Sequence, residues 1–461
     1  MRLLRGAIIT TIALAAAAAV SPGIAQAEPA AAAAGAKGTY TTLAPTRILD
    51  TRNGNGAPAG KIGRAGILHL QVGGRGGVPA SGVSAVTLNV TVTSPTDHSF
   101  LTVFPSGITR PTASSLNFTP GWTGANSVTV KLGANGGVDI YNHDGTTHVI
   151  VDVMGYYAEN DQAQSMNGLF HPITPRRLID TREDAEGALP SDYYLRSALN
   201  FGTDNPHIRA WAVNVTSTGA IGDGFLTAWN GDINSLQETS TLNYRRGETV
   251  PNMAIVPTAP CYDCGSFEGW PSIGVYAQTT THVIVDIVGF FDDGTFTGNG
   301  LRFDPIAPTR IVDTREALGA PGALGQATTT KITAPGTVLN TADGATSSLA
   351  LNVTAINPSI PTVLTVWANG IDGQTKPGVS NLNPQPGRVT PNAAITAIGP
   401  SNAFNVYNHG GNVHLVVDVV GRFYFPTATP AGALRMAPQP SGAPNAGRAG
   451  SVGFQSAHAA A

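Results

Sequence analysis

Three ionisable side chains recur together along this chain and could perform proton-transfer chemistry. The first set is Asp50, His148 and Asp152, and the same trio returns as Asp180, His282 and Asp286 and again as Asp313, His414 and Asp418. A histidine with two carboxylates suits general acid and base catalysis. However, no serine, cysteine or metal-ligand motif of fixed spacing accompanies the trio, and an enzyme rarely keeps one full set in three copies. We therefore favour a structural role and keep an extracellular hydrolase of glycan or peptide as the alternative.

The stretch that holds His148 and Asp152 alternates like a β-strand. Three valines point to one face, and Asp152 lies in the opposite row, which is otherwise largely apolar. A buried carboxylate without a partner is costly, so it needs a cation, and arginines recur in step with it. We therefore expect an ion pair between the first and last strands of each repeat: Arg52 or Arg47 with Asp152, Arg182 or Arg177 with Asp286, and Arg315 or Arg310 with Asp418.

The repeat that carries these residues is about 130 residues long, the size of a small domain. Charged residues make up only 12% of the chain, while Gly and Pro number 55 and 33, which is typical of short strands joined by many turns. We predict an all-β protein of three tandem β-sandwich modules, of jelly-roll or Ig-like type. The expected modules are residues 38–158, 168–293 and 300–425.

Seven or eight short strands are expected in the first module. Beyond the opening stretch with Arg47 and Arg52, they are residues 68–72, 86–93, 100–104, 115–118, 127–132, 138–141 and 148–154. Residues 86–93 alternate between aliphatic and Thr or Asn side chains, which predicts a strand covered on one face only. Asn89, Asn214 and Asn352 keep the same phase in the three modules, and we expect each to make a cross-strand hydrogen bond.

The two ends of the chain differ from the modules. Residues 1–27 have two early arginines, a short apolar run and a small-residue cleavage pattern, so we predict a secretory signal peptide and a secreted, extracellular protein without membrane insertion after cleavage. Residues 28–37 are a low-complexity linker, and residues 426–461 are an Ala, Pro and Gly-rich tail expected to be disordered. The formal net charge of -3 provides no basic surface for nucleic acid.

Aromatic residues at matching strand ends are the candidate ligand-binding groups. A flat ring beside Asn could stack on a sugar while the amide holds its hydroxyls, or it could simply close the end of a sandwich. The candidates are Phe104, Trp229 and Trp367 before one turn, and Tyr141 with Asn142, Tyr276, and Tyr407 with Asn408 before another.

The second module carries the only two cysteines, Cys261 and Cys264. Neither a thioredoxin-like context nor a second pair of zinc ligands surrounds them, so we expect a local disulfide. Two turns, residues 142–145 and 292–294, place oxygen ligands close together, but neither has the full calcium spacing. We therefore expect no cofactor, with calcium as the weaker alternative.

The repeated motifs resemble tandem repeats of secreted proteins from actinobacteria such as streptomycetes. They include Pro-Thr-Arg-Ile-Leu-Asp-Thr-Arg at residues 45–52, Leu-Asn-Val-Thr at 88–91 and Val-Asp-Val-Met-Gly-Tyr-Tyr at 151–157. This resemblance implies a secreted repeat protein but no activity, because the repeat has no assigned function. Together, these features favour a non-enzymatic binding protein that recognises cell-wall or extracellular polysaccharide through repeated weak sites. A structural or adhesive cell-surface protein that binds another protein is a further alternative.

Overall fold

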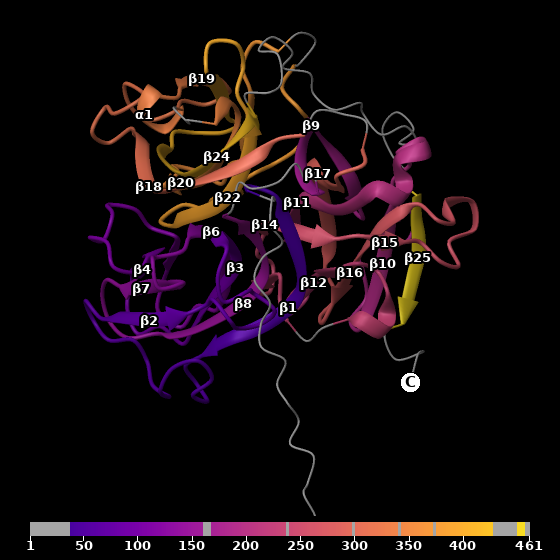
Figure 1. Cartoon of the computed structure of the whole chain (residues 1–461), viewed down its shortest axis with the longest axis horizontal. Coiled ribbons are helices and arrows are strands. Elements are labelled where there is room, and N and C mark those ends of the chain that lie inside the picture. The colour runs from indigo at the N-terminus through magenta and orange to yellow at the C-terminus, as the bar shows by residue number, and fades with distance from the viewer. Residues whose placement is uncertain are drawn as a thin grey trace, which may run out of the picture.

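The protein is all-β, and its strands form three groups around a common centre (Figure 1). The computed structural model describes residues 37–159, 167–236, 239–296, 300–339, 343–371, 375–426 and 450–456. Within these ranges, no helix has the length and apolarity needed to cross a membrane. The expected signal peptide, residues 1–27, lies outside the described residues, as does all of the predicted linker except Lys37.

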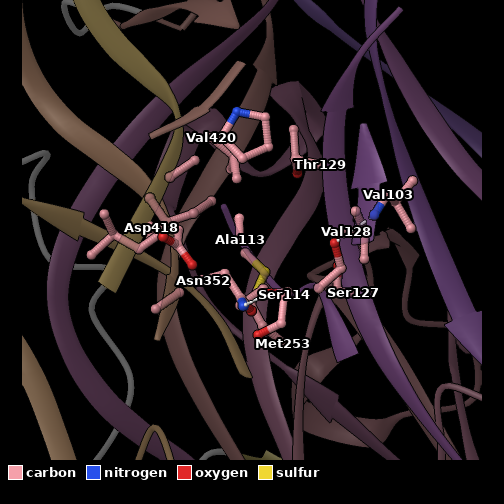
Figure 2. Close-up of a pocket in the computed structure, with 17 residues that line it drawn as sticks. Val103, Ala113, Ser114, Ser127, Val128, Thr129, Met253, Asn352, Asp418 and Val420 are labelled. Atoms are coloured by element: carbon pink, nitrogen blue, oxygen red, sulfur yellow. Dashed lines mark hydrogen bonds between the residues drawn. The ribbon is translucent and has the colours of Figure 1, made fainter. Parts of the chain in front are cut away.

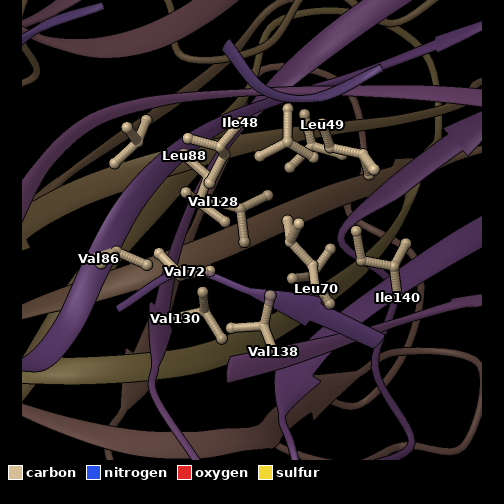
Figure 3. Packing of buried hydrophobic residues seen from close by; sticks show 14 of the residues in the cluster. Ile48, Leu49, Leu70, Val72, Val86, Leu88, Val128, Val130, Val138 and Ile140 are labelled. Carbon is tan, nitrogen blue, oxygen red and sulfur yellow. The ribbon is translucent and has the colours of Figure 1, made fainter. Parts of the chain in front are cut away.

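The first module has two antiparallel four-stranded sheets. Its strands are β1 (Tyr40–Asp50), β2 (Ile67–Gln71), β3 (Val83–Thr93), β4 (Ser99–Pro105), β5 (Leu116–Phe118), β6 (Gly124–Lys131), β7 (Gly137–Asn142) and β8 (His148–Ala158). The inner sheet has the order β1-β8-β3-β6 and the outer sheet β2-β7-β4-β5. Aliphatic side chains from both sheets fill the space between them, among them Leu49 and Leu88 from the inner sheet and Leu70 and Ile140 from the outer one (Figure 3).

The second module repeats this arrangement with additions. Its strands are β9 (Asn167–Asp180), β10 (Tyr193–Ala198), β11 (Ile208–Thr218), β12 (Gly224–Trp229), β13 (Leu242–Tyr244), β14 (Val250–Pro257), β15 (Ala259–Pro260), β16 (Pro271–Ala277) and β17 (His282–Asp293). The inner sheet is β14-β11-β17-β9. The outer sheet is β13-β12-β16-β10-β25, with β15 also on β16.

The third module has an inner sheet β18-β24-β20-β22 and an outer sheet β19-β23-β21. Its strands are β18 (Arg302–Asp313), β19 (Thr328–Thr333), β20 (Gly344–Ile356), β21 (Leu364–Ala368), β22 (Val389–Ala397), β23 (Ala403–Asn408) and β24 (His414–Pro426), with the short helix α1 (Gly336–Leu339) before β20. Each module therefore buries its own apolar core between two sheets.

The C-terminal segment differs from the sequence-based prediction of a disordered tail. Gly450–Ser456 form strand β25, which pairs antiparallel with β10 and extends the outer sheet of the second module (Figure 1). Backbone hydrogen bonds between the strands supply such a pairing at a sheet edge. The rest of the predicted tail beyond Pro426, residues 427–449 and 457–461, lies outside the described residues.

A ring of buried asparagines joins the three modules. The strands β6, β14 and β22 meet at the centre of the molecule. On each of them an asparagine side chain donates to an asparagine on the inner sheet of a neighbouring module. The pairs are Asn126 with Asn352, Asn252 with Asn89 and Asn392 with Asn214, at 3.1, 3.0 and 2.8 Å. The bonds run in one cyclic direction, so the single chain folds as a closed pseudo-trimer.

Backbone groups complete this ring. The N–H groups of Ser127, Met253 and Ala393 donate to Asn252, Asn392 and Asn126 of the next module, at 2.9, 3.0 and 3.3 Å. The amides of Asn89, Asn214 and Asn352 donate in turn to the carbonyl oxygens of Ser240, Ser380 and Ser114. The predicted cross-strand role of these three asparagines was wrong, because their partners lie in a different module. The polar face of β3 is therefore buried by a neighbour.

A second contact ring is aromatic and is also cyclic. It pairs an aromatic residue of each module's first strand with one from the last strand of another module. The pairs are Tyr40 with Phe291, Phe170 with Phe423 and Phe303 with Tyr157, with ring centroids 4.9, 4.6 and 4.1 Å apart. The glycine in each closing strand leaves space for the first-strand aromatic ring of the same module. A Cβ on Gly289, for example, would lie 2.4 Å from the Phe170 ring. This explains why glycine recurs at Gly155, Gly289 and Gly421.

Candidate functional site

The repeated carboxylates of the closing strands are bound by arginine from the first strand of the same module. Arg47 Nε lies 3.0 Å from Asp152 Oδ1, and the equivalent pairs are Arg177 with Asp286 at 3.0 Å and Arg310 with Asp418 at 2.9 Å. Of the two arginines that the sequence offered for each pair, the structure uses the earlier one. Burial raises the pKa of Asp152, and the hydrogen bond from Arg47 opposes that rise.

The later arginine of each motif binds a different carboxylate. Arg52 places its guanidinium on Asp50, with Nη2 to Oδ2 at 2.6 Å, and Arg182 and Arg315 bind Asp180 and Asp313 in the same manner at 2.6 and 2.7 Å. The hydrogen bond from Arg52 holds the pKa of Asp50 below its ordinary value. Arg52, Arg182 and Arg315 were therefore misplaced as partners of the closing-strand aspartates, because the tight Asp-Thr-Arg turn brings each arginine back onto its own Asp.

The histidines of the proposed catalytic trio are held by threonine. His148 Nδ1 lies 3.1 Å from Thr51 Oγ1, and His282 and His414 have the same relation to Thr181 and Thr314 at 3.1 and 3.0 Å. The Thr51 hydroxyl also accepts from the backbone N–H of Val149. These side chains hold the start of β8 to the end of β1, and both carboxylates of the trio are bound by arginine.

The three strand-end aromatic residues are buried rather than exposed. Phe104, Trp229 and Trp367 are 1%, 2% and 5% exposed, so none of them can stack on a sugar. Their side chains lie on the strand face opposite the core, because the preceding residues Val103, Ala228 and Val366 belong to the apolar cores of the modules and these three aromatic residues do not. Alternation alone does not reveal this, because an aromatic residue at a strand end fits either environment.

The two candidate asparagines are also buried. Asn142 donates to the carbonyl oxygens of Ile62, Gly63 and Gly145 and accepts from the Ser99 hydroxyl. Asn408 makes the matching bonds to Leu324, Gly325 and Gly411 and accepts from Thr362. Their hydrogen-bonding groups are occupied, so they fasten loops and are not ligand groups.

The three candidate tyrosines contact protein groups on the outer sheets. Tyr141 is buried under the guanidinium of Arg110, 4.2 Å from its ring centroid. The hydroxyl of Tyr276 donates to Asp192 at 2.7 Å, and Lys376 lies over the Tyr407 ring at 4.9 Å. Each tyrosine pairs across the outer sheet with the threonine two residues before the buried aromatic residue, as Tyr141 does with Thr102, but its ring is engaged by these protein groups.

The cysteines and the acidic turns have local structural partners. Cys261 and Cys264 form a disulfide, which packs with Phe267 and Trp270 against Ala198 of β10. Asp292 accepts from two backbone N–H groups and lies 2.8 Å from the buried His171 ring. Across the described part of the chain, no three His, Cys, Asp or Glu side chains gather as metal ligands would.

A small cavity lies at the seam between the third and first modules. Asp418 and Asn352 line one side and Ser127 and Val128 the other (Figure 2). Its volume of about 30 Å³ is enough for roughly one water molecule and too small for an organic ligand.

A larger pocket, which we call the axial pocket, lies where the turns between β5 and β6, β13 and β14, and β21 and β22 converge. It has a volume of about 520 Å³, within the range of small-molecule sites. All three modules contribute to it, at equivalent positions of the repeat. Its polar and aromatic lining residues include Asn117, Trp122, Arg246, Glu248, Asn383 and Arg388. The pocket exists only because the modules close into a ring.

Two buried oxygen atoms among the residues that line this pocket have no hydrogen-bond donor in the described structure. Glu248 Oε1 accepts from Arg388 Nη1 at 2.8 Å, but Oε2 has no partner. Asn383 Oδ1 is also buried without a partner. Its counterpart in the first module, Asn117 Oδ1, accepts from the Ser114 hydroxyl at 3.0 Å. Buried acceptors without donors are costly, so the residues that carry these two atoms form a polar part of the pocket wall.

Trp122 provides an apolar surface in the same pocket. Its side chain is half-buried, and its indole lies so close to Gly124 that a Cβ there would be 2.0 Å from the ring. The equivalent positions in the other modules hold Glu248 and Arg388. Sequence reasoning missed all three because it compared what the repeats share. The available signal was the pattern Leu-Asn-x-x-x-Gly-x-x-x-x-Asn, which begins at residues 116, 242 and 382.

Comparison with known proteins gives no relative from which a function could be carried over. No protein-family model matches the chain, and no curated protein sequence matches it.

Proposed function

We propose that this chain is a secreted, non-enzymatic protein that binds polysaccharide or a related cell-surface polymer, and that the axial pocket is its binding site. The observation that carries this proposal is a pocket of about 520 Å³ in which the half-buried indole of Trp122 lies beside polar side chains from all three modules, among them Asn117, Glu248 and Asn383. A ligand with several hydroxyl groups can donate to and accept from such side chains. Sugars have this chemistry.

The other lining residues fit the same class of ligand. The indole of Trp122 offers an apolar surface for the C–H face of a sugar ring, and the amide of Asn117 offers further polar contacts. A volume of about 520 Å³ accommodates one or two sugar rings. The site would therefore take a short stretch of a polymer.

This proposal replaces three weak sites with one shared site. The strand-end aromatic residues expected to form a site in each module are buried, whereas the axial pocket takes side chains from all three modules. Extracellular location is supported by the predicted signal peptide at residues 1–27 and by the disulfide between Cys261 and Cys264, which is typical of oxidising compartments. The resemblance to secreted actinobacterial repeats agrees with this location.

The test is a pull-down of the mature chain on insoluble peptidoglycan, chitin and cellulose. We expect at least one polymer to retain the protein. Trp122→Ala should weaken retention about tenfold, because it removes the aromatic surface of the pocket. Tyr262→Ala is the matched control, since Tyr262 is 64% exposed and lies on the disulfide loop outside the pocket.

Melting curves should first establish that both variants fold. Loss of retention in Trp122→Ala alone would support the axial pocket as the glycan site. Equal retention of Trp122→Ala and the original chain would place binding elsewhere, and failure of the original chain to bind any of the three polymers would contradict the proposal.

A further inference from the structure

The axial pocket has a positive lining in a chain that is slightly acidic overall. Arg246, Arg388 and Glu248 are its charged lining residues, and the formal net charge of the chain is -3. Glu248 and Arg388 bind each other at 2.8 Å, so their charges largely cancel. Arg246 then supplies the net charge of the pocket.

The guanidinium of Arg246 has no acidic partner among the described residues, and the residue is exposed. Its backbone N–H donates to Asp223 Oδ1 at 3.0 Å, but the side chain forms no ion pair with that carboxylate. The neighbouring Arg245 donates to the carbonyl oxygen of Gly121 in the first module. This bond holds the turn that carries Arg246 against the turn that carries Trp122.

We propose that the axial pocket selects an anionic sugar, with Arg246 binding the charged group. The inference rests on the proposed function and specifies its ligand. A guanidinium can give two parallel N–H hydrogen bonds to a carboxylate or a phosphate, and such charge-assisted bonds are about twice as strong as neutral ones. The hydroxyls of the same sugar would meet polar side chains of the lining such as Asn117, while the ion pair with Arg388 limits repulsion from Glu248.

The charged group could be a uronic-acid carboxylate or a sugar phosphate, and the choice of probes separates them. The full chain is titrated calorimetrically with cellobiose, with cellobiuronic acid, which replaces one hydroxymethyl by a carboxylate, and with glucose and glucose 6-phosphate. We expect the better anionic probe to bind about tenfold more tightly than its neutral counterpart at low salt. The preference should shrink at about 1 M salt, because Arg246 is exposed to solvent.

The variant Arg246→Gln should lose the preference for the anion and keep the affinity for the neutral sugar. Arg64→Gln is the matched control, because Arg64 is also exposed, at 79%, and pairs with Asp144 outside the pocket. Since both side chains are at the surface, neither change should prevent folding. A tenfold preference that disappears only in Arg246→Gln would support the inference.

Three results would overturn it, and they are distinguishable. Equal binding of neutral and anionic probes would contradict the selection of charge and leave the proposed glycan binding intact. If Arg246→Gln still prefers the anionic probe, Arg246 does not bind the charged group. If none of the four probes binds, the result contradicts both the inference and the proposed function.

Discussion

Replacing Asn252 by alanine should destabilise the whole molecule, because this side chain is part of the ring that joins the modules. Asn252 Nδ2 donates to Asn89 Oδ1 at 3.0 Å and to the Thr241 carbonyl at 2.6 Å, and Oδ1 accepts from Ser127 N–H at 2.9 Å. The residue is 1% exposed. Three buried groups would lose their partner, and each such loss costs about 1 to 3 kcal/mol. Partial relaxation should limit the total to about 3 to 6 kcal/mol.

The assay is urea unfolding followed by far-UV circular dichroism. We expect the original chain to unfold in one transition, because the asparagine ring and the aromatic ring couple the modules, and Asn252→Ala should either shift this transition strongly or split it. Asn412→Ala is the control, since Asn412 is exposed on a turn of the third module and should change stability by under about 0.5 kcal/mol. Three separate transitions in the original chain, or a loss below about 1 kcal/mol in Asn252→Ala, would refute the closed-ring account.

Three further predictions concern the ion pairs and the C-terminal strand. Asp152→Ala should lower the free energy of unfolding by about 3 kcal/mol in urea titrations, because it leaves the partly buried Arg47 with only its longer ion pair to Asp50, and an unchanged curve would show that the pair of Arg47 with Asp152 is unimportant. The pKa of Asp50 is held below its ordinary value of 3.8, so its stabilising contribution is present above that pH and is lost as the pH falls through the lowered value. Asp50→Asn should therefore flatten the fall in Tm below about pH 4, and identical acid slopes would contradict this. Deleting residues 450–461 should uncover the edge of β10, lower Tm only slightly and increase self-association in sedimentation experiments, whereas a fully monomeric truncated chain would argue against an exposed pairing edge.

The all-β class and the burial of Asp152 could be predicted from the sequence. The alternation of Val149, Val151 and Val153 identified the core face of β8, and the structure places those three valines in the core and Asp152 opposite them. The need for an arginine partner followed from the cost of burying a charge. The choice of Arg47 over Arg52 could not be predicted, because it depends on the turn that returns Arg52 to Asp50.

The closed ring could not be read from strand patterns. A row of Thr and Asn on β3 predicts a solvent-facing surface, but hydrogen bonds from another module satisfy Asn89 and allow that row to be buried. The axial pocket was missed for a related reason. Near a pseudo-threefold axis, the residues at one position of the repeat come from all three modules and line the same pocket. Trp122, Glu248 and Arg388 occupy such a position but differ in type, so a comparison of shared motifs does not find them.

The most direct test of the central claim is the number of sugar sites per chain. Equilibrium dialysis of the full chain against labelled cellobiuronic acid, carried to saturation, counts bound probe molecules. The account predicts one probe per chain, lost in Trp122→Ala and kept in Tyr262→Ala, because a single pocket is built from all three modules. Three equivalent probes per chain, or no saturable binding, would contradict it.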